Sequence, residues 1–169
     1  MGRKKAIENI YSRRSVMFKN PIAKNIFYAV VIAFFGFILL NLTILFDFLI
    51  QSAIDQFFPA GLNMTSRWYP PVKHIIFVAI IALISWGVFK SRLGELYKAT
   101  YSTVPVAVAL VTTGMFLYRW PILAYGVSAV ILGAIILYLN RTKKTWLYYY
   151  AVILVASVLL IMGLLGVDI

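Results

Sequence analysis

The stretch IFYAVVIAFFGFILLNLTILFDFLI, residues Ile26–Ile50, decides the fold of this chain. About 21 residues without a charge precede Asp47 in it, and about 20 apolar residues are enough for a helix to cross the ~30 Å apolar core of a bilayer. The core of a cleavable signal peptide is shorter, at about 7–15 residues. The block is therefore predicted to stay in the chain as a first membrane-spanning helix.

Four further apolar blocks each predict another membrane-spanning helix: Ile75–Phe89, Thr103–Tyr118, Ile122–Leu139 and Trp146–Val167. The chain is therefore predicted to be an all-α, polytopic integral membrane protein, with five transmembrane helices in a single domain at residues 21–169. The third block is short, at about 16 residues, and has Pro105 near its start. The tight turn at residues 119–121 predicts that the third and fourth helices form an antiparallel hairpin.

The composition also indicates a bilayer environment. Apolar residues make up 63% of the 169 positions and the mean hydropathy is +0.91, whereas soluble domains are about 45–50% apolar. A soluble chain of this length has too much surface to hide such a share. The chain also lacks cysteine, which excludes disulfides, thiolate metal sites and cysteine nucleophiles.

Basic residues are unevenly distributed between the two sides of the predicted bundle. The N-terminal tail and the loops after the second and fourth helices hold 13 of the 16 Lys and Arg residues, and the opposite side holds 3. The positive-inside rule therefore predicts a cytoplasmic N-terminus and an outer C-terminus. We expect a multi-pass protein of the cell (plasma) membrane. The net charge of +11 is attributed to orientation and to anionic lipid headgroups at the inner face, and no nucleic-acid partner is expected.

Residues 1–20 are predicted to form a basic cytoplasmic tail, for which two interpretations are open. Residues 6–18 could lie on the inner membrane surface as a short basic amphipathic helix. Alternatively, the tail is frayed and only sets the orientation of the first helix.

A polar stripe at the outer end of the first helix is the best candidate for a functional site. Thr43, Asp47, Gln51 and Asp55 recur every four residues and so share one helix face. Acidic groups within a membrane are costly and usually face the protein interior or a water-filled cavity. Arg119, on the same side, is a possible partner for Asp47. In the competing interpretation, Asp47 lies near the interface and the stripe is a solvated helix face.

The predicted outer polar pocket would bind an ion or a lipid headgroup. Its residues are Thr43, Asp47, Gln51, Asp55, Arg67, His74 and Arg119. His74 is interpreted as an interfacial residue, because no metal-ligand pattern surrounds it. No catalytic residue, metal or cofactor is predicted.

Two further features concern contacts between helices. Asn41, nearer the middle of the first helix, is predicted to hydrogen-bond across to another helix. Small residues on the last three helices, such as the pairs Ala124/Ser128 and Ala129/Gly133, predict close packing within the chain or the seam of a homo- or hetero-oligomer.

Three functions are compatible with these features. The first is transport, by a small permease or a membrane subunit of a larger transporter that uses the outer polar pocket. The second is a non-catalytic assembly or scaffold subunit of a membrane complex. The third is a membrane-embedded lipid-modifying enzyme. It has the least support, because an enzyme normally needs two or more convergent ionisable groups, and only the outer polar pocket offers any.

Overall fold

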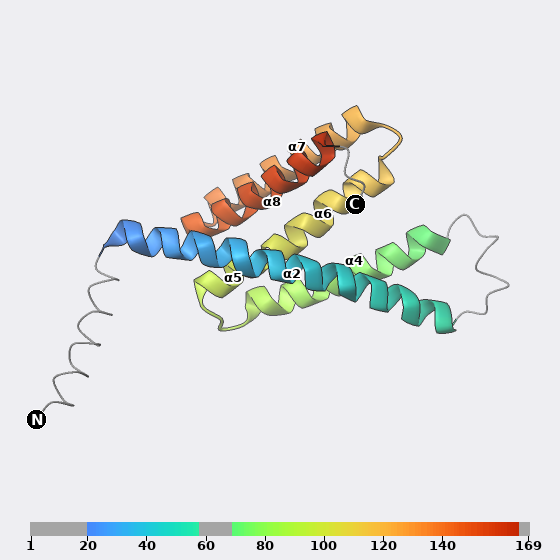
Figure 1. Cartoon of the computed structure of the whole chain (residues 1–169), viewed down its shortest axis with the longest axis horizontal. Helices are drawn as coiled ribbons and strands as arrows, with labels where there is room; N and C mark the ends of the chain where they lie inside the picture. Colours follow the sequence, from blue (N-terminus) through green and yellow to red (C-terminus); the bar gives the residue numbers. More distant parts are fainter. Residues whose placement is uncertain (1–19, 58–68, 166–169) are drawn as a thin grey trace, which may run out of the picture.

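The computed structural model describes residues 20–57 and 69–165, and its regular elements there are all helices. They are α2 (Pro21–Phe57), α4 (Tyr69–Lys90), α5 (Glu95–Tyr101), α6 (Thr103–Phe116), α7 (Pro121–Arg141) and α8 (Trp146–Leu164). Five helical segments are long and apolar enough to cross a membrane, with α5 and α6 counted as one (Figure 1). The prediction of an all-α chain with five candidate membrane helices is therefore confirmed for the described residues. The predicted tail, residues 1–20, lies outside them except for Asn20.

Helix α2 is much longer than a membrane crossing requires. Its 37 residues extend over about 55 Å. Pro21 stands at the first helical position, where its missing N–H costs nothing, and the Oδ1 atom of Asn20 accepts a hydrogen bond from the backbone N–H of Ile22 at 3.1 Å. The helix continues without a break to Phe57, so the polar stripe begins within the predicted first span and ends on its extension at Gln51 and Asp55.

The third span is longer than the sequence predicted. It begins at Glu95 rather than Thr103, and covers 22 residues up to Phe116. The sequence predicts its first part, α5, to lie in the loop after the second predicted helix, because this segment contains Lys98 and several polar residues. In the structure the ammonium of Lys98 donates a 3.0 Å hydrogen bond to the backbone carbonyl of Phe89 near the end of α4. A basic side chain in this position stabilises the end of a helix.

The separation of α5 from α6 coincides with a proline. Pro105 has no N–H to donate to the carbonyl four residues earlier, and its ring crowds that carbonyl, which disturbs the helix at this point. Two buried hydroxyls next to the break bond to the helix's own carbonyls: Ser102 Oγ to Ala99 at 2.6 Å and Thr103 Oγ1 to Thr100 at 2.8 Å. Polar residues can therefore be buried here without unpaired donors.

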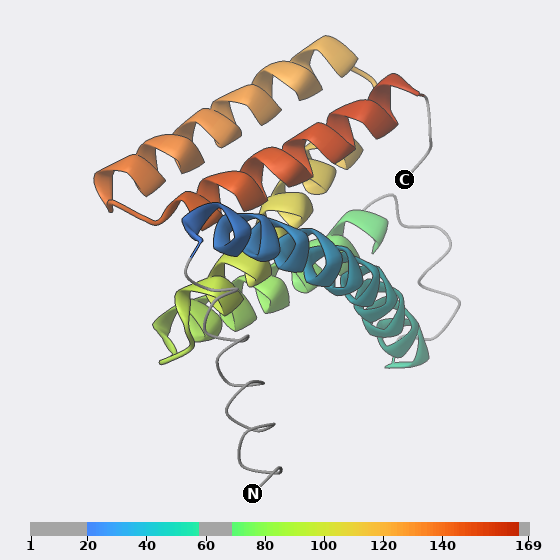
Figure 2. The same ribbon diagram turned by 60° about the vertical axis from the view of Figure 1, so that its left-hand side comes forward.

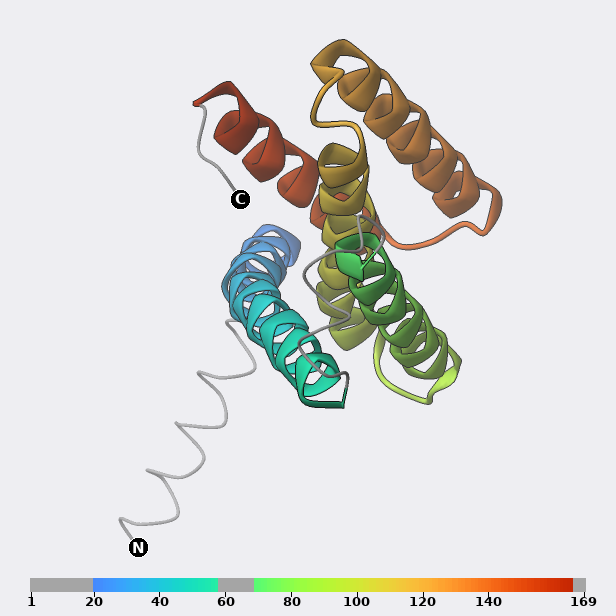
Figure 3. The same cartoon turned by 90° about the vertical axis from the view of Figure 1, so that its right-hand side faces the viewer.

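Helix α6 lies at the centre of the bundle, with contacts to α2, α4, α7 and α8 (Figure 3). One face packs Val106, Ala107 and Leu110 against α8 and α2, in a cluster that includes Ile32 and Val155. The opposite face packs Val104 and Val108 against Phe77 and Ile81 of α4. Both core clusters are thus built on one helix.

The remaining helices are much less enclosed. Half of the apolar window of the Glu95–Phe116 span is buried, against 11% for α2 and 6% for α7. Helices α7 and α8 run side by side as an antiparallel pair that covers α6 on one side (Figure 2). The predicted tight turn joins α6 to α7, and these two helices also contact each other.

Candidate functional site

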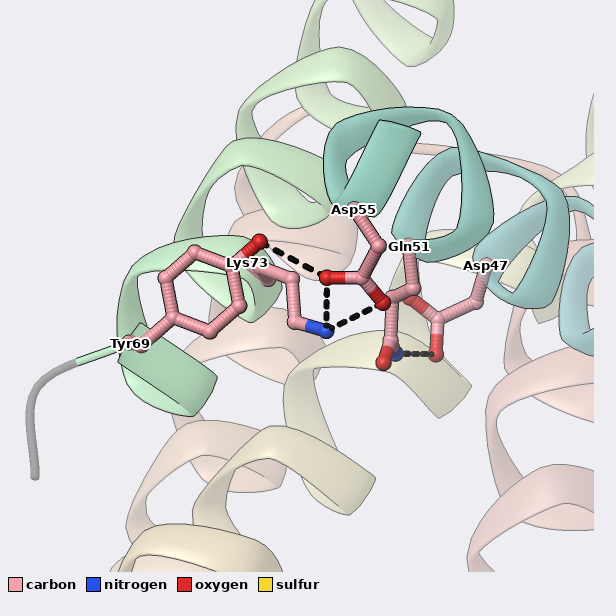
Figure 4. Close-up of polar contacts among 5 residues, drawn as sticks. All are labelled: Asp47, Gln51, Asp55, Tyr69 and Lys73. Atoms are coloured by element: carbon pink, nitrogen blue, oxygen red, sulfur yellow. Dashed lines mark hydrogen bonds and ion pairs between the residues drawn. The ribbon is translucent and has the colours of Figure 1, made fainter. Parts of the chain in front are cut away.

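The polar stripe of α2 faces the rest of the protein. Thr43, Asp47 and Gln51 are half-buried, whereas Ile44 and Phe48 between them are 65% and 68% exposed. Figure 4 shows the stripe opposite Tyr69 and Lys73, which extend toward it from α4. We call the end of the bundle where α2 finishes and α4 begins the predicted outer end.

Asp55 at the end of the stripe is fully paired. The Nζ atom of Lys73 donates to both carboxylate oxygens, at 3.0 and 3.1 Å, and the Tyr69 hydroxyl donates to Oδ1 at 2.7 Å (Figure 4). The side chain of Lys73 is 13% exposed and that of Asp55 is 49% exposed. This cluster of three side chains holds the end of α2 against the start of α4.

Tyr69 was absent from the predicted pocket, and Lys73 was expected only to lie at the same depth as its members. They lie four residues apart, so they share one face of α4. That spacing is the signal that could have identified them, together with the acid that ends the stripe.

Asp47 has quite different surroundings. Its Oδ2 atom accepts a 2.8 Å hydrogen bond from the Gln51 amide. Its Oδ1 atom is buried and has no hydrogen-bond partner among the described residues. The stripe is therefore not the solvated face of the competing interpretation, at least at this oxygen.

The depth of Asp47 follows from the pairing of α2 with α4. Helix α4 has 22 residues, about 33 Å, which matches a bilayer core of about 30 Å. Asp55 meets Lys73 near the start of α4, and Asp47 lies two turns, or about 12 Å, along α2 from Asp55. If α4 spans the bilayer, the carboxylate of Asp47 is therefore well inside the predicted outer end.

Arg119 does not join this cluster. It is exposed, and its Nε atom donates a 2.9 Å hydrogen bond to the hydroxyl of Tyr118. Within residues 20–57 and 69–165 the ion pair is Lys73–Asp55, so the expected contact between Arg119 and Asp47 is not formed. Arg119 belongs to the turn before α7, whereas the stripe faces α4.

His74 is buried between the helices of the bundle. It is 7% exposed, and its Nε2 atom lies 2.9 Å from the hydroxyl oxygen of Thr112 on α6. The rings of Phe77 and Phe116 flank it, with centroids 5.8 and 6.2 Å away. Its Nδ1 atom is buried without a partner in the part of the chain described. His74 therefore ties α4 to α6, a contact that the sequence did not predict.

The other predicted polar positions make local contacts or cannot be placed. The Asn41 amide donates to the Phe37 carbonyl of its own helix at 2.8 Å and is exposed, so it does not bridge two helices as predicted. Thr43 likewise donates to the Leu39 carbonyl, at 2.7 Å. Arg67 lies outside the described residues. Among those residues no group of three His, Cys, Asp or Glu side chains could hold a metal ion.

The small residues of the last three helices line an open hollow. It has a volume of about 930 Å³ and lies between α6, α7 and α8; its small lining residues are Gly114, Ala124, Ser128, Ala129, Ala156, Ser157 and Gly163. A Cβ atom added at Gly114 or Gly133 would meet nothing within 4 Å. Close packing within the chain, predicted for these residues, is thus not formed at those two glycines.

Comparison with known proteins adds no family assignment. No protein-family model matches the chain, and neither the curated proteins nor the solved structures gave a significant match.

Proposed function

We propose that the chain is a transport-related membrane protein, either a small permease or a membrane subunit of a larger transporter, in which Asp47 binds a small cation. The observation that carries the proposal is the buried Oδ1 atom of Asp47, which has no partner among the described residues. An acidic side chain at the centre of a membrane helix costs roughly 2.5–3.5 kcal/mol on insertion scales. A cation on the free oxygen would offset that cost.

The surroundings of Asp47 favour a single positive charge. Gln51, which contacts it, is neutral, and the nearest acid along the stripe, Asp55, is already paired with Lys73. Multivalent metal ions usually need several anionic ligands, and the described residues offer no cluster of three. The proposed ligand is therefore a small monovalent cation.

The test compares wild type with Asp47→Asn, which removes the charge and keeps the shape. The thermal unfolding midpoint in mild detergent is measured at neutral pH in sodium, potassium and choline chloride. Wild type should be stabilised by sodium or by potassium relative to choline. A ligand at 100 times its Kd adds about 2.7 kcal/mol, which is a measurable shift. Asp47→Asn should lose the response, and proteoliposomes that carry it should lose uptake of the same ion.

Asp55→Asn is the matched control, because it makes the same chemical change on the same helix face. Asp55 is occupied by Lys73 and Tyr69, so this variant should change stability but retain the cation response. An equal response in wild type and Asp47→Asn would contradict the proposal.

A second function, assembly into a membrane complex, is favoured by a separate observation. The only residue of α7 that is buried within the described part of the chain is Leu139, near its last turn. The hollow beside α7 is lined by small residues, which let another helix approach closely in lipid. A membrane subunit of a larger transporter would combine both functions, and such a subunit should co-purify with a partner chain.

We further propose that the N-terminus is cytoplasmic, the C-terminus is outside and the protein resides in the cell membrane. The support is the excess of basic residues on one side of the span pattern. With this orientation, the stripe and Arg119 face the outer leaflet.

A further inference from the structure

The positively charged side chain of Arg119 takes no part in the site proposed at Asp47. Its contacts within residues 20–57 and 69–165 are with Tyr118 alone, through the hydroxyl at 2.9 Å and the ring at 5.7 Å. The described part of the chain provides no acid for it, since the ion pair there joins Lys73 to Asp55. An exposed guanidinium at the end of a membrane helix is well suited to bind an anion from the surroundings.

A second hollow begins at this arginine. It has a volume of about 760 Å³, starts at Arg119, Trp120 and Pro121, and continues along one face of α7 to Val130 and Ile131. Beyond Arg119 its lining carries no charge. All of its lining residues belong to α7 and the turn before it, so the hollow is an open groove along one face of this helix.

The length of this hollow matches one leaflet of a bilayer. From Pro121 to Ile131 the helix rises about 15 Å, which is half of a ~30 Å apolar core. Its wall is left open at Gly126, where an added Cβ atom would meet nothing within 4 Å. The hollow therefore has room for an extended acyl chain that begins at the arginine and ends near the middle of the membrane.

We propose that this hollow binds an anionic glycerophospholipid, with its phosphate on Arg119 and one acyl chain along α7. Charge complementarity selects this occupant, because Arg binds phosphate oxygens through two parallel hydrogen bonds, and the rest of the lining accepts only hydrocarbon. The exposed Trp120, at the same level, belongs to a residue type that favours the headgroup layer. A transmembrane helix of a partner would cover the same apolar face but leave the guanidinium unmatched.

The test is native mass spectrometry of delipidated protein titrated with phosphatidylglycerol or phosphatidylcholine in mild detergent. Wild type should retain one phosphatidylglycerol with clear preference over phosphatidylcholine. Arg119→Gln should weaken that binding about 10-fold, the effect of losing one charge-assisted contact, and Arg119→Lys should weaken it less. Gly126→Leu, which fills the hollow and keeps the charge, should also weaken binding.

Arg141→Gln is the matched control, since it removes one exposed positive charge from the opposite end of the same helix. It should bind phosphatidylglycerol as wild type does. Equal losses in Arg119→Gln and Arg141→Gln would overturn the proposal, as would no bound phosphatidylglycerol in wild type or a second protein chain in its place. Circular dichroism and gel filtration of each variant separate lost binding from lost folding. The site is independent of the cation proposed at Asp47, so either can fail alone.

Discussion

Asp47 and Asp55 share one face of α2, yet their carboxylates meet opposite conditions. Asp55 accepts three hydrogen bonds, all from α4, whereas one oxygen of Asp47 is buried without a partner in the described chain. A buried polar group that lacks a hydrogen bond costs about 1–3 kcal/mol. At the scale of single residues, Asp55 therefore contributes to helix pairing, and Asp47 is the position where a ligand would relieve an energetic cost.

His74 and Thr112 provide a test of polar contacts at the same scale. Thr112→Val removes the hydroxyl that lies 2.9 Å from the His74 ring and should lower stability by about 0.6–2 kcal/mol, the range for hydrogen bonds between membrane helices. The neighbouring Thr113 bonds only within its own helix, to the Ala109 carbonyl at 2.8 Å, so Thr113→Val is the control. Thermal unfolding in detergent measures both, and equal midpoints for the two variants would contradict a role for His74 in joining α4 to α6.

At the scale of helices, the crossing of α2 over α6 depends on a glycine. Gly36 is buried, and an added Cβ atom would lie 3.1 Å from the methyl group of Thr103. The absence of a side chain thus lets α2 approach the central helix where the third span changes from α5 to α6. Packing of this kind is the main source of helix association in lipid, where both helices and solvent are apolar.

Gly36→Leu should therefore push α2 away from α6. Overpacking of a close contact costs about 1–3 kcal/mol, and the thermal unfolding midpoint should fall accordingly. Gly133→Leu makes the same change on α7, where an added Cβ atom meets nothing within 4 Å, and it should have a smaller effect. A larger loss of stability in Gly133→Leu would mean that α7 is covered by another chain or that the α2–α6 crossing is less important than proposed.

The whole molecule is an open bundle around one enclosed helix. Among the described spans, only Glu95–Phe116 has half of its apolar window buried, and the share is lowest for α7, at 6%. For a chain that crosses a bilayer, lipid or a partner must cover the other helices. This openness explains why the two hollows both adjoin α7.

The proposed orientation can be tested on the intact chain, because it contains no cysteine. Lys144 and Arg119 lie outside the helices, at opposite ends of α7. Each can be replaced in turn by a single cysteine. In intact cells, a membrane-impermeant maleimide should label Arg119→Cys, while Lys144→Cys should react only after the membrane is opened. The reverse pattern would place the N-terminus outside and would move the stripe to the cytoplasmic side.

Sequence pattern was enough to predict the five candidate membrane spans of the described residues and their helical type. Runs of apolar residues long enough to cross a bilayer leave few alternatives to a helix, because every backbone group must be satisfied within the segment. It also placed the polar stripe correctly on one face of α2, since four-residue spacing follows from helix geometry. The sequence prediction was wrong at the start of the third span, because polar residues there are typical of a loop. In the structure, two of their hydroxyls bond to the helix's own carbonyls.

Which side chains meet depends on how the helices pack in three dimensions. Helices that are apolar all round carry no sequence pattern to show which face is buried. The four-residue spacing of Tyr69 and Lys73 shows that they share a face of α4, but not that this face, rather than Arg119, meets the stripe. The burial of His74 against Thr112 and the hollows beside α7 depend in the same way on how helices distant in sequence cross. In lipid, side-chain shape and polar contacts set those crossings, because hydrophobic burial no longer distinguishes one apolar face from another.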